Sequence, residues 1–181
     1  AGTGRRQTAL VLGENVLQAS GTFSNRERFA EYIVRGQQAG DDAWEGAAAA
    51  GPEGRATDPA IGRYRPLIVI AELPEGQSFA DRARWEASVR AGRADRAEYT
   101  VTGWRDGPDG TGALWRPNAL VDVRDARLGV NGTMLIASVS WQLDDRGRRT
   151  VLSLVKPQAF ELIALRDKEE DGLWTSQPSA E

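Results

Sequence analysis

Two alternating segments on either side of a turn, between Arg127 and Phe160, restrict the fold of this chain more than any other feature of its sequence. The stretch reads "RLGVNGTMLIASVSWQLDDRGRRTVLSLVKPQAF", in which apolar residues recur at every second position, and this pattern predicts a long β-hairpin. With Arg146 and Gly147 at the tip, Trp141 is expected opposite Leu152. This register places one set of apolar residues on a single face: Leu135, Ala137, Val139, Trp141, Leu143, Leu152 and Leu154.

Composition excludes several kinds of chemistry. The chain has no histidine and no cysteine, which excludes histidine general bases, thiol nucleophiles, disulfides and the usual structural zinc ligands. Its net charge is only −3, with acidic and basic residues spread along the whole length, which argues against a general nucleic-acid or membrane-surface binder. No apolar run approaches the ~20 residues that cross a bilayer. We therefore expect no cofactor, no metal site and no membrane association.

The chain divides by composition into four parts. Residues 1–37 contain two strand-like runs separated by Gly-Glu-Asn, which predicts a β-hairpin, and residues 38–66 are rich in Ala, Gly, Pro and acids, which predicts a loop or linker. Residues 67–165 are expected to form a β-rich module that opens with a strand covered on both faces, and residues 166–181 a disordered polar tail. Because the chain starts with Ala1 instead of Met, we expect a fragment of a longer protein.

One helix is predicted over residues 79–91, with Ser78 as its N-cap and Gly92 at its end. Its apolar residues form two stripes, one with Phe79, Ala83 and Ala87 and the other with Trp85 and Val89. A second stripe is typical of a helix that packs against another module or subunit, and a broad core face produces the same pattern. We take Trp85 and Val89 as candidate interface residues.

Two further tryptophans are candidate interface residues, Trp44 in the predicted linker and Trp104 at the end of an alternating strand-like segment. Trp44 has a plainer explanation, which is that it folds back onto its own domain, since tryptophan is usually well buried. Exposed indoles also stack on sugars and bases. A β-barrel module that binds carbohydrate or single-stranded nucleic acid is therefore one alternative function.

Carboxylates are the remaining candidates for catalysis, and those near strand ends are Glu72, Glu75, Asp122, Asp125, Asp144 and Asp145. A pair of them could act as in glycoside hydrolysis, which makes a cell-wall hydrolase a second alternative. Their spacing matches no catalytic motif, however. The turns "GPDGTG" and "DDRG" lack the lysine of a phosphate loop and the ligand set of a calcium loop. We predict no catalytic residues.

Several blocks follow one another along the chain: "GENVLQASGTFSNRERFAEYIVRGQ", "RPLIVIAE", "RARWEASVRAGRADRAEYTVTGWRD" and "LWRPNALVDVRDARLGVNGTMLIASVSWQLDDRGRRTVLSLVKPQAFEL". This series closely resembles the baseplate hub tail proteins of Mu-like phages and prophages, in particular the C-terminal portion of such proteins. The resemblance extends from about residue 12 to residue 162. The Ala/Gly-rich segment at 40–58 has no counterpart in that pattern.

The resemblance implies an α+β fold, made mainly of antiparallel β-barrel modules with one main helix. It also implies a structural virion protein, a homotrimer that forms a ring with pseudo-sixfold symmetry between the tail tube and the central spike of a contractile tail. The spike and tube proteins would be its partners, and the genome would pass through its channel without specific nucleic-acid binding. The protein would be assembled in the bacterial cytoplasm and reside in the tail baseplate. No catalytic residues follow from the family.

Overall fold

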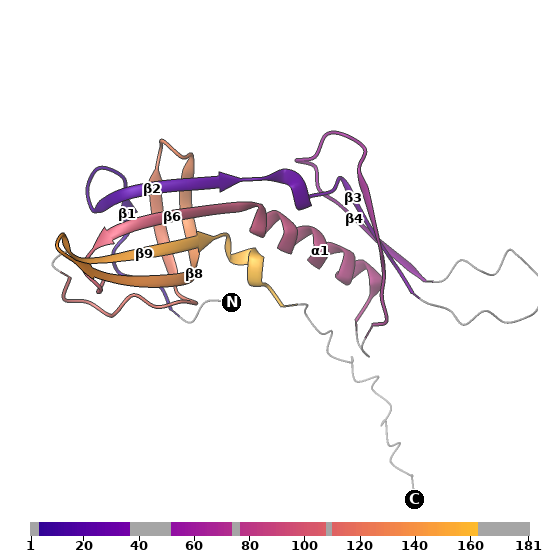
Figure 1. The fold of residues 1–181 in the computed structure, drawn as a ribbon. Coiled ribbons are helices and arrows are strands. Elements are labelled where there is room, and N and C mark those ends of the chain that lie inside the picture. Colours follow the sequence, from indigo (N-terminus) through magenta and orange to yellow (C-terminus); the bar gives the residue numbers. More distant parts are fainter. Residues whose placement is uncertain (1–3, 37–51, 74–76, 108–109, 163–181) are drawn as a thin grey trace, which may run out of the picture.

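The computed structural model describes residues 4–36, 52–73, 77–107 and 110–162, which form two β-sheets connected by one long helix (Figure 1). The strands are β1 (Leu10–Val11), β2 (Val16–Phe23), β3 (Glu31–Arg35), β4 (Glu53–Thr57), β5 (Pro66–Ile70), β6 (Asp95–Thr102), β7 (Leu120–Asp125), β8 (Val130–Asp144) and β9 (Gly147–Val155). The helices are α1 (Phe79–Ala94) and two short 3-10 helices, η1 (Asn25–Glu27) and η2 (Pro157–Phe160). The predicted α+β class with one main helix is confirmed. Within the described residues, no helix is both long and apolar enough to span a membrane.

The larger sheet has six strands in the order β1-β7-β8-β9-β6-β2, and only the pair β1 and β7 is parallel. Side chains from strands across the sheet meet in one core, including Leu10 of β1, Val121 of β7 and Tyr99 of β6. Neighbouring strands lie about 4.8 Å apart, so a flat sheet would separate β1 from β6 by roughly 19 Å. The sheet therefore curves around its own core as a half-barrel.

The β8–β9 hairpin forms as predicted, but its register differs by two residues. Residues 145–146 make the turn, and Trp141 lies opposite Thr150 instead of Leu152. Gly147 follows the turn with a φ of 92°, a left-handed conformation that favours glycine. Alternation of apolar residues could not reveal this shift, because a slip of two residues keeps every side chain on the same face.

A β-bulge between Ile136 and Ser138 divides β8 into two parts. Ile136 joins Leu152 in the core of the half-barrel, whereas Leu135 packs against Val155 on the opposite face. The predicted single apolar face is therefore wrong for Leu135 and Ala137, which share this opposite face, because one extra residue in a strand reverses the alternation of side chains beyond it.

The hairpin predicted within residues 1–37 is not formed. β1 pairs with β7 and β2 pairs with β6, so the two strands stand at opposite ends of the strand order. The turn between them is nevertheless present: the Asn15 side chain accepts a hydrogen bond from the N–H of Val11 at 2.8 Å and donates one to the carbonyl of Ala9 at 2.7 Å. Local sequence identified the turn, while distant strands determined the pairing.

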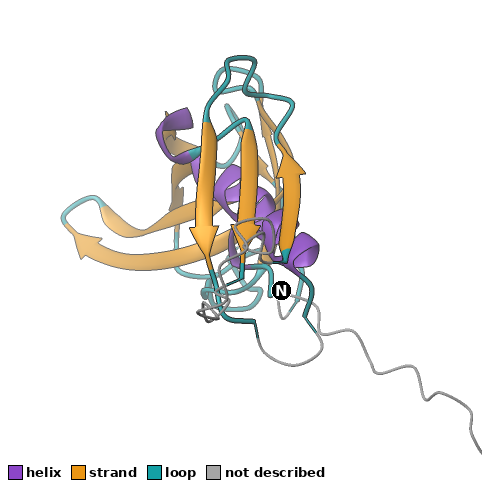
Figure 2. Ribbon diagram, turned by 90° about the vertical axis from the view of Figure 1, so that its right-hand side faces the viewer, coloured by secondary structure: helices purple, strands orange, loops and turns teal. Residues whose placement is uncertain are grey.

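The smaller sheet has three strands in the order β4-β3-β5, and Figure 2 shows them side by side in front of α1. Tyr32 and Val34 of β3 pack with Ala83 of α1, and all three side chains are completely buried. Gly54 of β4 allows this close packing, because a Cβ at that position would lie 2.0 Å from the carbonyl carbon of Phe79. The helix thus lies directly on the backbone of the sheet.

The segment 38–66, predicted to be a loop or linker, contributes β4 at Glu53–Thr57. Its composition concealed this strand, because Glu, Gly and Ala are all weak strand formers. Trp44 and the predicted 166–181 tail lie outside the described residues.

β5 is an edge strand instead of the fully covered strand that its apolar run predicts. It ends at Ile70, and the side chains of Ile68 and Ile70 are 54% and 67% exposed. Leu67 and Val69, on the other side of the strand, pack in the cluster that includes Ala83 of α1. A continuous apolar run thus supplies one face to the core and one to solvent.

The helix α1 begins where predicted, with the Ser78 hydroxyl accepting a hydrogen bond from the N–H of Asp81 at 3.0 Å. It continues to Ala94, beyond the predicted end at residue 91. Gly92 lies inside the helix, and a Cβ there would be 2.4 Å from the backbone nitrogen of Ala159 in η2. This glycine therefore permits close packing of η2 and does not terminate the helix. α1 then passes directly into β6 (Figure 1).

Candidate interaction surfaces

A hollow of about 490 Å³ on the surface of α1 is lined by both interface residues predicted for the helix. Val89 is only 3% exposed, whereas Trp85 is partly exposed. The Trp85 indole nitrogen donates a hydrogen bond to the carbonyl of Glu161 at 2.6 Å, and the Arg82 guanidinium lies 4.6 Å from the ring centre. The structure thus brings Trp85 and Val89 together, but Trp85 offers much more surface to a partner.

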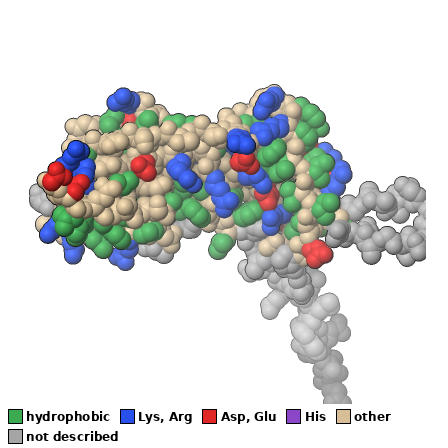
Figure 3. Space-filling view, viewed as in Figure 1, with side chains coloured by type: hydrophobic (Ala, Val, Ile, Leu, Met, Phe, Trp, Pro, Cys, Tyr) green, Lys and Arg blue, Asp and Glu red, His purple; other side chains and the backbone are tan. Residues whose placement is uncertain are grey.

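Charged side chains surround this hollow: Arg26, Arg82, Arg90, Arg93, Glu27 and Glu86. Glu86 is 7% exposed and accepts hydrogen bonds from Arg82 at 2.8 Å and Arg90 at 3.1 Å. Figure 3 shows Lys and Arg side chains gathered over this part of the molecule. Glu86 thus holds Arg82 and Arg90 against the helix surface and neutralises part of their charge. These two arginines are therefore not free to bind a ligand.

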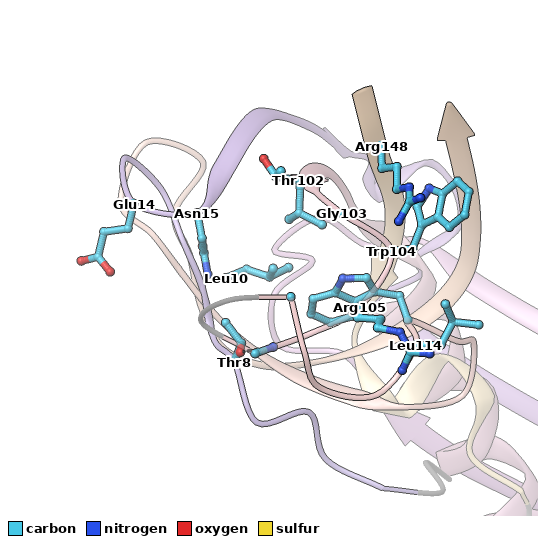
Figure 4. A pocket seen from close by; sticks show the side chains of 14 residues that line it. Thr8, Leu10, Glu14, Asn15, Thr102, Gly103, Trp104, Arg105, Leu114 and Arg148 are labelled. Carbon is cyan, nitrogen blue, oxygen red and sulfur yellow. Dashed lines mark hydrogen bonds between the residues drawn. The ribbon is translucent and has the colours of Figure 1, made fainter. Parts of the chain in front are cut away.

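A larger pocket of about 780 Å³ opens between the turn that follows β1 and the described parts of the β6–β7 connection (Figure 4). Trp104 lines it, with its indole nitrogen donating to the carbonyl of Gln142 at 3.1 Å and the Arg148 guanidinium 5.1 Å from its ring centre. Trp115 is a second indole in the lining but is only 2% exposed. The accessible charge of the pocket comes mainly from Arg148 and Arg105.

Large apolar side chains are also exposed at the far end of the β8–β9 hairpin. Trp141 is 46% and Leu143 is 67% exposed, and Figure 3 shows hydrophobic side chains gathered along this end of β8. The sequence pattern placed both residues on the same face as the core residues of the hairpin, and this face is correct. Both side chains are nevertheless exposed, because β8 extends beyond the core. Together with Ile68 and Ile70 on β5, they give the molecule apolar surfaces of the kind that mark protein contacts.

The carboxylates considered for catalysis are dispersed. Glu72 follows β5 in the smaller sheet, Asp122 lies on β7 in the larger one, and Glu75 lies outside the described residues. The guanidinium of Arg5 donates to Asp122 at 2.6 Å and the Thr133 hydroxyl donates at 2.8 Å, and these hydrogen bonds hold the pKa of Asp122 below its usual value. Among the described residues, no group of three or more acidic side chains is placed to hold a metal ion.

Asp125 and Asp144 are likewise engaged in structural contacts. Asp125 is completely buried, and it accepts hydrogen bonds from the Tyr99 hydroxyl at 3.1 Å and from the N–H groups of Arg127 and Leu128 at 2.9 Å. Burial, followed by the hydrogen bond to Asp125, raises the pKa of Tyr99 well above its usual value. Asp144 accepts a hydrogen bond from the backbone of the hairpin turn at 3.0 Å. These carboxylates stabilise turns and do not converge on one site.

Comparison with known proteins identifies the family. Residues 76–163 match the family described as "Mu phage baseplate assembly protein GpP, fourth domain". The chain is also 33% identical over 170 residues to the baseplate hub protein gp44 of Escherichia phage Mu, covering 88% of this chain and 43% of that protein. The chain belongs to the baseplate hub protein family of Mu-like phages.

Solved structures of tail proteins share the fold of this hub family member. The 43 kDa tail protein of prophage MuSo2 from Shewanella oneidensis is 40% identical with a TM-score of 0.70, covering 86% of this chain and 43% of that one. A tail protein from Neisseria meningitidis MC58 is 18% identical with a TM-score of 0.64, covering 87% of this chain and 45% of that one. The chain thus spans less than half the length of these relatives. The predicted family, that of phage tail baseplate hub proteins, is confirmed.

Proposed function

We propose that the longer protein to which this chain belongs assembles as a homotrimer into a ring of the baseplate hub, between the tail tube and the central spike of a contractile tail. The observation that carries this proposal is the similarity to the hub protein gp44 over 88% of the chain. The spike and tube proteins are then its partners. The genome passes through its channel, and a net charge of only −3 suits a channel wall that does not retain nucleic acid.

The distribution of apolar surface supports ring assembly. A subunit of a ring meets its two neighbours through different surfaces, so it needs two separate contact regions. The exposed face of β5 and the surface of α1 around Trp85 are the two regions that we assign to these contacts. Our candidate contact residues are Trp85 and Trp104, because partly exposed tryptophans contribute strongly at protein interfaces. The buried Val89 lines the same hollow as Trp85 and completes this candidate set.

Two further points belong to this proposal. The predicted module at 67–165 contains the fourth-domain match at 76–163, and it is completed by β1 to β4, which contribute strands to both sheets. Assembly takes place in the cytoplasm of the bacterial host, and the finished protein remains in the virion. The absence of cysteine means that no disulfide is required in that reducing compartment.

Light scattering tests the proposal directly. The mass of the full-length protein is measured alone and after mixing with the spike protein encoded beside it. We expect three times the monomer mass, and a further increase that corresponds to one spike complex per trimer. A monomer whose mass does not change in the presence of the spike protein would refute the proposed assembly.

A further inference from the structure

Two arginines in the pocket beside the β1 turn have no carboxylate partner. Arg105 and Arg148 both line this pocket, and neither has an Asp or Glu oxygen within 4.0 Å among the described residues. Arg105 donates to the carbonyl of Gly112 at 3.1 Å, and Arg148 lies over Trp104. Figure 4 shows Glu14, the one carboxylate among the described lining residues, pointing outward on the opposite side. The pocket therefore presents uncompensated positive charge.

An apolar strip adjoins this charge. Leu143 pairs with Arg148 across the β8–β9 ladder, so the two side chains share one face of the hairpin. Trp141 lies two positions along β8 on the same face, and the exposed fractions of Trp141 and Leu143 are 46% and 67%. Leu114, which lines the pocket, is 42% exposed. A ligand bound along this strip would contact the apolar side chains over most of its length and the arginines at one end.

The same part of β8 has a free edge. β8 pairs with β7 only over Val130–Leu135, so residues 137–144 have no strand on that side within the described part of the chain. Exposed strand edges of this kind accept an extended peptide, whose backbone pairs with the edge while alternate side chains meet one face of the sheet. An eight-residue edge beside an apolar strip thus favours an extended peptide as the occupant.

The indoles of the pocket are poorly placed to bind sugars or bases. Stacking on an aromatic side chain requires an open ring face. The Arg148 guanidinium lies over the Trp104 ring at 5.1 Å, and Trp115 is only 2% exposed. The two alternatives that rely on stacking, carbohydrate and single-stranded nucleic acid, are therefore less favoured than a ligand whose carboxylates pair with the guanidinium groups.

We propose that the pocket containing Arg105 and Arg148, together with the strip formed by Trp141 and Leu143, binds an extended peptide segment of a neighbouring tail protein. This segment carries apolar residues and then acidic residues on one face. Its apolar side chains cover Trp141 and Leu143, and its carboxylates pair with the two arginines. The inference deepens the proposed function and rests on it, because it names the kind of partner segment that a hub subunit receives.

Isothermal titration calorimetry of the 181-residue chain tests the proposal. The probe is the synthetic peptide acetyl-TLTLTDTD-amide, and the comparison peptide is acetyl-TLTLTNTN-amide, which has the same shape without charge. We expect the acidic peptide to bind at least about tenfold more tightly, since hydrogen bonds between charged groups are stronger than neutral ones. Its affinity should also fall as salt is raised from roughly 0.05 to 0.5 M, because exposed charges are screened.

Single substitutions assign the binding to this pocket. R148Q and R105Q should each weaken the acidic peptide about tenfold or more, whereas R63Q, which removes an exposed arginine of the smaller-sheet region, should not. L143S should weaken both peptides. If R148Q lowers the melting temperature, R105Q and L143S still decide the question.

Three results would overturn the proposal: equal affinity for the two peptides, no effect of R105Q, or tighter binding of an eight-nucleotide dT oligomer than of the acidic peptide. The ring proposal is judged separately by light scattering. A trimer that binds the spike but not the peptide would refute only the peptide site. A monomer that binds the peptide but not the spike would refute the ring assembly.

Discussion

Replacing Gly92 with alanine sets helix propensity against close packing. In an open helix, glycine to alanine stabilises by about 1 kcal/mol. Here the new Cβ would lie 2.4 Å from the nitrogen and 2.9 Å from the Cα of Ala159, roughly 1 Å short of an ordinary contact. Overpacking costs about 1–3 kcal/mol, and the upper part of this range applies because the atoms that must move belong to backbone. We therefore expect a net loss of about 1–2 kcal/mol.

Thermal unfolding followed by circular dichroism measures this loss. For a chain of this size, each kcal/mol shifts the melting temperature by about 2–4 °C, so G92A should melt about 2–8 °C below wild type. G62A is the matched control, because nothing lies within 4 Å of a Cβ at Gly62 and its φ is not in the left-handed region. Its melting temperature should stay within about 2 °C. If G92A melts at or above the wild-type temperature, η2 is not held against α1 as described.

Three other predictions concern buried charge and exposed surface. Y99F removes one of the hydrogen bonds to the buried Asp125 and should lower the free energy of unfolding in urea by about 1.5–3 kcal/mol; an unchanged urea midpoint would contradict this role. Burial raises the pKa of Asp58, but three effects together outweigh it: the hydrogen bond from Arg28 at 2.8 Å, the hydrogen bond from the N–H of Ala60 and the positive charge of Arg28. The net pKa of Asp58 therefore lies below its usual value. The stabilisation by this ion pair is therefore present above about pH 4 and is lost as the pH falls through the lowered pKa of Asp58. In urea unfolding, R28Q should be less stable than wild type at pH 7, and the stability of the two proteins should become similar near pH 2. An equal difference in stability at both pH values would argue against the pairing. I70K should change stability by less than about 0.5 kcal/mol, since this side chain is 67% exposed, yet reduce the trimer fraction in light scattering; a large fall in melting temperature would place Ile70 in the chain's own core.

Features that depend on neighbouring residues were predictable from the sequence. Ser78 marks the start of α1 because its hydroxyl caps a backbone N–H within the same turn. The β8–β9 hairpin is recognisable because both strands alternate over many residues. The pairing of β1 with β7 was not predictable, since it depends on how the six-stranded sheet curves and not on the turn that joins β1 to β2.

The candidate interaction surfaces were likewise predictable from the sequence only where they depend on neighbouring residues. Helical periodicity placed Trp85 and Val89 on one stripe, and the structure brings them to one hollow. The lack of a carboxylate partner for Arg105 and Arg148 within the described residues gave no sequence signal, because whether an arginine is paired depends on carboxylates that approach from distant strands. Ile68 also could not be recognised as exposed, since an apolar run looks the same in a covered strand and in an edge strand.

The direct passage of α1 into β6 has a mechanical consequence. No residue separates the helix from the strand. At this junction, the N–H of Ser24, which follows β2, donates a hydrogen bond to the carbonyl of Ala94 at 3.0 Å. The smaller sheet and the half-barrel are therefore linked by a helix and by the η1 segment, which run alongside each other and leave little freedom for hinge motion. In the proposed hub, each subunit would therefore move as a rigid body and transmit force along its length. Movement during tail contraction would then take place between subunits.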